Sequence, residues 1–158
     1  MRLVAQFEVF GRCVPWSMPA VGERGGRPRF CRKDPALIAW QARIVDAART
    51  AMDAAPVELG PVMLDIEFYR ETPLGKQHGD WWDVRVEHAP SKGKHTKRGQ
   101  MSPDLTNLLK GTEDAIEEVV IGNDAQACRI VAGRLYGPQD GVRVTAYALE
   151  PGDRPASA

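Results

Sequence analysis

The residues that could do chemistry together lie in one segment, SPDLTNLLKGTEDAIEEVVIGNDAQ, at positions 102–126. The first part reads as a helix, and its polar side carries Asp104, Asn107, Lys110 and Asp114. The turn beyond the helix adds a further carboxylate, Asp124. Convergent carboxylates bind a hard divalent cation through oxygen, and a nearby ammonium group stabilises charge on a phosphate. Residues of these types are therefore typical of metal-assisted phosphodiester hydrolysis.

The helix that must position these groups is expected over residues 103–119, with Ser102 as N-cap and Pro103 as the first helical residue. An apolar stripe at helical spacing predicts its buried side: Leu105, Leu108, Leu109, Ala115, Ile116 and Val119. Gly111 costs roughly 1 kcal/mol relative to alanine in a helix. Either something approaches the helix closely at this glycine, or the loss is tolerated. The alternative for the whole segment is an ordinary surface helix with a capping aspartate.

The rest of the chain predicts one mixed α+β domain over residues 1–150, in the order β-α-β-(long loop)-α-β-β. Period-two strands are expected at 3–11, 61–70, about 125–136 and 141–149. A second helix is expected from Pro35 to Met52, with Asp34 as its N-cap. Three further segments are expected to be irregular: a loop at 11–34, a long basic and aromatic loop at 71–101, and a disordered tail at 151–158.

Composition narrows the class of protein. With 43% apolar and 27% charged residues in 158, the chain is typical of a soluble globular domain. No apolar run approaches the roughly 20 residues that a membrane span needs. The three cysteines are odd in number and lack a C-x-x-C pair, which favours a reducing cytoplasm over a disulfide framework.

Basic residues cluster in two loops although the formal net charge is zero. Residues 24–33 and 92–98 hold these clusters, and the members that we expect to contact DNA phosphates are Arg27, Arg29, Lys92, Lys94, Lys97 and Arg98. The alternative is that both loops are simply solvated.

The run PDLTNLLK, followed by EDAI and NDAQ, resembles the signature of the RusA-like Holliday junction resolvases, a family of crossover junction endodeoxyribonucleases. The resemblance extends to Gly11, Pro15 and the RPR at 27–29. It implies a homodimer that cleaves branched DNA, such as a four-way junction, with Mg²⁺, which Mn²⁺ could replace. It also implies roles for individual residues: Asp104 and Asp124 as catalytic metal ligands, Lys110 as the group that stabilises charge, and Asn107, Asp114 and Thr106 as supporting residues.

Two positions depart from the family pattern. Thr106 and Asn123 stand where the family carries aspartates. A missing ligand could be replaced by one of four other carboxylates: Glu113, Asp114, Asp80 or Asp83.

Other interpretations remain open from the sequence. Because Thr106 replaces a family aspartate, one alternative is a module that binds branched DNA without cutting it. A nuclease acting on flaps or forks, and a structural dimer with no role in nucleic-acid metabolism, are further alternatives. The three histidines (His78, His88 and His95) lack a recognised zinc spacing with the cysteines. The pair Trp81 and Trp82 could stack on an unpaired base or anchor the long loop.

Overall fold

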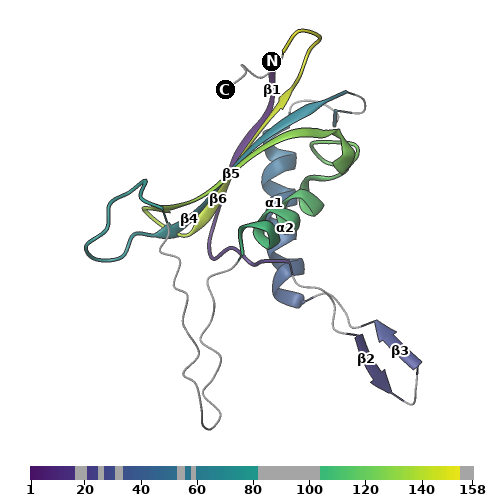
Figure 1. Cartoon of the computed structure of the whole chain (residues 1–158), viewed down its shortest axis with the longest axis vertical. Helices are drawn as coiled ribbons and strands as arrows, with labels where there is room; N and C mark the ends of the chain where they lie inside the picture. Colours follow the sequence, from purple (N-terminus) through teal and green to yellow (C-terminus); the bar gives the residue numbers. More distant parts are fainter. Residues whose placement is uncertain are drawn as a thin grey trace.

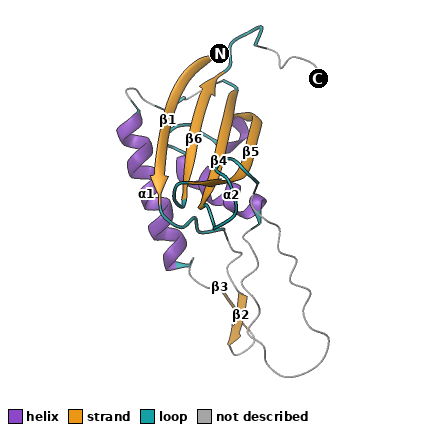
Figure 2. Cartoon of the chain, turned by 90° about the vertical axis from the view of Figure 1, so that its left-hand side faces the viewer, coloured by secondary structure: helices purple, strands orange, loops and turns teal. Residues whose placement is uncertain are grey.

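A four-stranded sheet with two helices on one face makes up the body of the protein (Figures 1 and 2). The structure is a computed structural model that describes residues 1–16, 21–24, 27–30, 34–52, 56–57, 60–81 and 104–153. The sheet contains β1 (Arg2–Phe10), β6 (Gly141–Ala148), β4 (Val62–Glu71) and β5 (Ala127–Gly137), in that spatial order. The helices are α1 (Pro35–Ala51) and α2 (Leu105–Ile116). The predicted mixed α+β class is confirmed.

The strand connections determine where α2 must lie. β6 pairs antiparallel with both β1 and β4, whereas β4 and β5 are parallel. Parallel neighbours need a crossover connection, and α2 lies in the segment that runs from β4 to β5. The crossover therefore places α2 against the sheet and delivers the residues after it to the start of β5.

The core lies between the sheet and the helices. Along β4, Leu64, Ile66 and Phe68 are fully buried, whereas the residues between them are only half-buried. The helices contribute buried residues at helical spacing: Leu37, Trp40, Ile44 and Ala48 from α1, and Leu108, Ala115 and Ile116 from α2. The start of α1 is as predicted, because the Asp34 carboxylate accepts a hydrogen bond from the Ala36 backbone N–H at 2.9 Å.

The structure differs from three of the predicted segments. Part of the expected loop at 11–34 forms a hairpin, in which β2 (Val21–Arg24) pairs antiparallel with β3 (Arg27–Phe30). The Gly-Gly pair that lies between these strands in the sequence is typical of a two-residue hairpin turn and could have predicted the hairpin. Helix α2 is shorter than 103–119: its N-cap is Asp104 rather than Ser102, and it ends at Ile116. Finally, residues 124–126 form a 3₁₀ turn, η1 (Asp124–Gln126), so that β5 begins only at Ala127.

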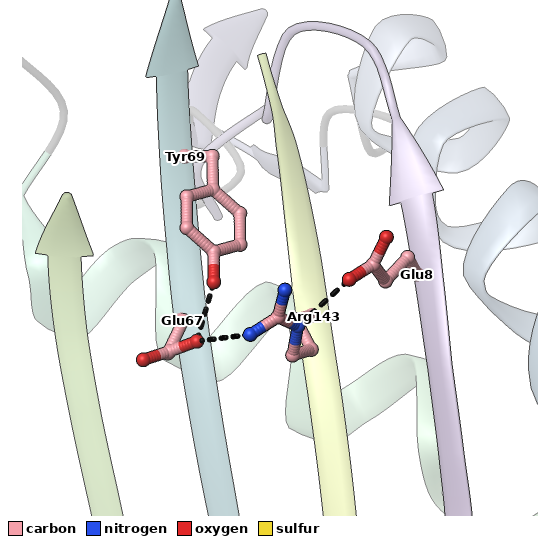
Figure 3. A network of polar contacts seen from close by, with 4 residues as sticks. All are labelled: Glu8, Glu67, Tyr69 and Arg143. Carbon is pink, nitrogen blue, oxygen red and sulfur yellow. Dashed lines mark hydrogen bonds and ion pairs between the residues drawn. The ribbon is translucent and has the colours of Figure 1, made fainter. Parts of the chain in front are cut away.

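The helix-free face of the sheet carries a cross-strand polar network (Figure 3). Arg143 Nε contacts Glu8 Oε1 at 2.7 Å, and Arg143 Nη1 contacts Glu67 Oε2 at 3.1 Å. The Tyr69 hydroxyl donates to Glu67, and burial together with this bond raises the pKa of Tyr69 to about 12. Two carboxylates around one guanidinium leave the network itself with an excess of negative charge.

Two cysteines differ in their surroundings. Cys13 is buried, and its thiol donates to the Gly141 carbonyl at 3.0 Å; burial is the largest cause that raises its pKa to about 12. Cys128 is exposed. Both are free thiols, and the third cysteine, Cys31, lies outside the described residues. In the part of the chain that the structure describes, no helix is long and apolar enough to cross a membrane.

Candidate active site

Asp104 lies at the N-terminus of α2, where it caps the helix. Its Oδ1 accepts a hydrogen bond from the Thr106 backbone N–H at 3.2 Å, and its carbonyl accepts from the Leu108 N–H at 3.0 Å. Both Asp104 and Thr106 are exposed. The helix dipole favours a negative charge at this end. The capping role that the sequence left as an alternative is therefore present, and it is compatible with metal binding because a carboxylate has a second oxygen.

Lys110 projects from the same helix between two partners. Its Nζ lies 3.3 Å from Asp114 Oδ1, one turn further along α2, and 5.7 Å from the centre of the Trp16 ring. About half of the Lys110 side chain remains exposed. The ammonium group is thus both restrained and accessible to a phosphate.

Gly111 is buried beneath the segment that follows β1. A Cβ at this position would lie 3.5 Å from the Trp16 backbone nitrogen and 3.6 Å from the Val14 carbonyl oxygen. The Gly111 carbonyl accepts a hydrogen bond from Gln41 Nε2 of α1 at 3.0 Å. The close approach at Gly111 is made by the protein's own backbone at residues 14–16. Gly111 is therefore not part of a ligand-facing surface.

Replacing Gly111 with alanine is expected to leave stability unchanged or to raise it by up to about 1 kcal/mol, because the distances around the added Cβ are ordinary van der Waals contacts and alanine favours the helix. Urea unfolding measures the difference. The control is Gly11→Ala, which should destabilise the protein, since Gly11 has φ +122° and its Cβ would lie 2.8 Å from Arg43 Nη1. A clear loss of stability in Gly111→Ala would contradict this account of the helix contact.

Asp124 is the first residue of η1, and its turn is held at both ends. Asn123 Oδ1 accepts from the Ala125 N–H at 2.9 Å, and Gln126 Oε1 accepts from the Asn123 N–H at 2.9 Å. Gln126 Nε2 also donates to the carbonyls of Val57 and Gly60, at 3.0 and 3.1 Å. The exposed Asp124 side chain therefore stands on a turn that is fastened to the segment before β4.

The charges near the end of α2 influence one another. The pKa of Glu113 is raised, chiefly because the side chain is half-buried; Lys110 opposes the increase, and the charges of Asp124 and Asp114 add to it. Asp124 thus lies within electrostatic range of Glu113 in the last turn of α2.

Asp104 lies at the other end of α2 from Glu113 and Asp114. Glu113 lies nine positions after Asp104, which corresponds to about 14 Å along the axis. Ligand oxygens lie within about 2.6 Å of a bound Mg²⁺ or Ca²⁺. Neither Glu113 nor Asp114 is therefore well placed to share one ion with Asp104. Among the described residues, no three His, Cys, Asp or Glu side chains form a group that could hold a metal ion. The convergence of Asp104 and Asp124 on a metal stays a prediction.

The candidate replacement ligand Asp80 belongs to the opposite end of β5. Its carbonyl accepts from the Tyr136 N–H at 2.8 Å, and its carboxylate accepts from the Gln77 N–H at 3.0 Å. Tyr136 lies nine strand positions after Ala127, a span of roughly 30 Å, and Asp124 lies just before Ala127. Asp80 is therefore not a partner of Asp124.

Trp81 packs on the same end of the sheet. It forms a bridge with Leu135, and its ring would contact a Cβ on Gly133 at 3.2 Å. The backbone bridge attaches residue 81 to the sheet, but 69% of Trp81 is exposed, so both interpretations of this tryptophan stay open. His78 is engaged locally, with Nδ1 2.7 Å from Thr72 Oγ1.

Several predicted residues cannot be placed in this site. Arg27 and Arg29 lie on β3, for which the structure describes only the backbone pairing. The remaining candidates fall outside the described residues: Trp82, Asp83, His88, Lys92, Lys94, His95, Lys97 and Arg98.

Sequence reasoning missed two residues of other segments that contact α2 and one residue within that helix. Trp16 lies over Lys110, Gln41 binds the Gly111 carbonyl, and the buried Thr112 hydroxyl donates to the Leu108 carbonyl at 3.1 Å. No periodicity marks Trp16, because it comes from an irregular segment. Thr112 could have been suspected from its place between apolar helix positions.

Comparison with known proteins gives two matches. The family model described as endodeoxyribonuclease RusA matches residues 11–147, which begin directly after β1 and include both helices, β4, β5 and all but the last residue of β6. The uncharacterized protein YqaN of Bacillus subtilis (strain 168) is 23% identical to the chain over 143 residues, covering 88% of this chain and 92% of that protein.

Proposed function

Because the chain belongs to the RusA endodeoxyribonuclease family, we propose that it is a metal-dependent endonuclease that resolves four-way DNA junctions or closely related branched DNA. The observation that carries the proposal is the family match over residues 11–147, which contains Asp104, Lys110 and Asp124. The structure supports it by leaving both carboxylates and half of the Lys110 side chain exposed.

The carboxylate oxygens of the proposed site are the type of ligand that a magnesium ion prefers. Mg²⁺ prefers oxygen ligands, keeps several waters and is usually held by one or two carboxylates together with substrate phosphates. Asp104 and Asp124 offer such carboxylates, and Mn²⁺ could take the same place. When bound, the metal would lower the pKa of a water molecule and neutralise phosphate oxygens.

The other residues act on the DNA. Lys110 would place its ammonium where negative charge develops on the phosphate, while Asp114 restrains it. Asn107 would support this region from the same helix. The basic residues predicted in the two loops would hold flanking phosphates without reading sequence.

We further infer a cytoplasmic homodimer. A two-fold axis would present two active sites to opposing strands of a junction, as symmetric cleavage requires. The family resemblance supports this arrangement, and the two free cysteines agree with a reducing compartment.

The test is cleavage of an end-labelled four-way junction, a flap and a linear duplex, each with Mg²⁺ and with EDTA, by the wild type and by Asp124→Asn. Paired nicks in the junction that need metal and vanish in the variant are the expected result. Equal cutting of the flap would favour a nuclease of broader specificity. Tight junction binding without cleavage in Mg²⁺ or Mn²⁺ would indicate a non-catalytic binder, and the absence of salt-dependent DNA binding would refute any DNA role.

Thr106→Asp tests whether the departure from the family pattern limits catalysis. We expect cleavage to rise about five- to tenfold, equivalent to roughly 1–1.4 kcal/mol, because the variant adds a carboxylate next to Asp104. Stability should not fall, since a negative charge in the first turn of α2 is favourable. Single-turnover cleavage and urea unfolding measure the two effects. Thr106→Asn is the uncharged control, and an equal gain in that variant would contradict the electrostatic explanation.

A further inference from the structure

Trp16 is joined to the polar side of α2 although it lies far from that helix in the sequence. Its backbone N–H donates to the Asn107 carbonyl at 2.8 Å. Its nitrogen and the Val14 carbonyl pack over Gly111, where no side chain separates the two segments. The backbone of residues 14–16 is thus attached to the same helix that carries Asp104 and Lys110.

This attachment places the Trp16 ring against the lysine. The ammonium nitrogen of Lys110 lies 5.7 Å from the ring centre, within the range of a cation–π interaction, and the ring is itself half-buried. The second restraint on Lys110 is Asp114, at 3.3 Å. The lysine is therefore held from two sides, by a carboxylate from its own helix and by an aromatic face from another segment.

The two restraints differ in what they leave available. Asp114 neutralises the ammonium charge and occupies an N–H donor, and an exposed ion pair of this kind is weak. An aromatic face attracts the cation without forming a hydrogen bond, so the three N–H donors stay available to a phosphate. A lysine that leaves Asp114 for a phosphate can keep its contact with the ring.

We propose that Trp16 is a positioning residue that holds the Lys110 ammonium toward the phosphate of the DNA substrate. This inference rests on the proposed function of Lys110. It adds a residue outside the segment 102–126 to the active site, and it connects that site to the segment that leads toward the β2–β3 hairpin.

A double-mutant cycle tests the proposal. Trp16→Leu should slow single-turnover junction cleavage about fivefold with little change in junction affinity, whereas Trp16→Phe, which keeps an aromatic face, should stay within about twofold of wild type. In the Lys110→Ala background, Trp16→Leu should cause no further loss, because its effect passes through the lysine. Equal losses in both backgrounds, or a Phe variant as slow as the Leu variant, would overturn the proposal.

A second measurement reports the contact without using activity. Reductive ¹³C-methylation of the lysines gives an NMR signal for Lys110, which is identified by its absence in Lys110→Arg. The signal should be shifted upfield by the indole ring in the wild type and should move toward the free-lysine position in Trp16→Leu. An unshifted wild-type signal would overturn the contact. A wild type that shows the shift but cuts no branched DNA would instead refute the proposed function, and cleavage that Trp16→Leu leaves unchanged would refute the positioning role alone.

Discussion

Asp104→Asn is expected to reduce junction cleavage at least about 100-fold while leaving the protein folded, because it removes the charge of a metal-binding carboxylate and keeps the helix cap. The asparagine side chain can still accept the hydrogen bond from the Thr106 N–H. Asp104→Ala loses both functions, and it should also lower the free energy of unfolding by about 0.5–2 kcal/mol. Cleavage rates at saturating Mg²⁺ and urea unfolding separate the two effects.

The matched control for Asp104 is the N-cap of the other helix. Asp34 accepts a hydrogen bond from the Ala36 N–H in the same manner, but it belongs to α1. Asp34→Ala should therefore cost a similar amount of stability without a change in the cleavage rate under conditions where the protein is folded. If Asp104→Asn cleaved junctions at the wild-type rate, Asp104 would be only a helix cap, and its assignment as a metal ligand would fail.

Gln126→Ala is expected to reduce cleavage by about 10–100-fold although Gln126 is not itself a proposed ligand, because it fastens the turn that presents Asp124. The variant removes the bonds to the carbonyls of Val57 and Gly60 and the acceptor for the Asn123 N–H. Because two of these three bonds are exposed to water, their loss should lower the free energy of unfolding by only about 0.5–1.5 kcal/mol. The Mg²⁺ dependence of cleavage should move to higher concentration.

Arg143→Met serves as the control for this second prediction. Arg143 also connects separate strands, through Glu8 and Glu67, but it does so on the helix-free face of the sheet (Figure 3). Its replacement should destabilise the protein and leave the Mg²⁺ dependence of cleavage unchanged. If Gln126→Ala lost stability alone, with the same metal dependence as the wild type, Gln126 would be a purely structural residue.

The elements of the fold were largely predictable from local patterns. Alternation along β4 and the helical spacing of Leu37, Ile44 and Ala48 reflect which side of each element is buried, and that side is fixed by the period of the element itself. The N-cap of α1 was also predictable, because Asp34 bonds to a residue only two positions away. The start of α2 was not, since Ser102 and Asp104 both suit an N-cap and sequence patterns locate helix ends poorly.

For the candidate site too, some features were predictable from local sequence and others were not. The sequence by itself determined the residue types and the order of Asp104, Lys110 and Asp124, and hence the family and the class of chemistry. Only the tertiary structure decided their surroundings: Trp16 over Lys110, the Gln126 tie beneath Asp124, and Asp80 at the far end of β5. These contacts join segments that are distant in the chain, and their geometry depends on how the strands pair and the helices pack rather than on any local period.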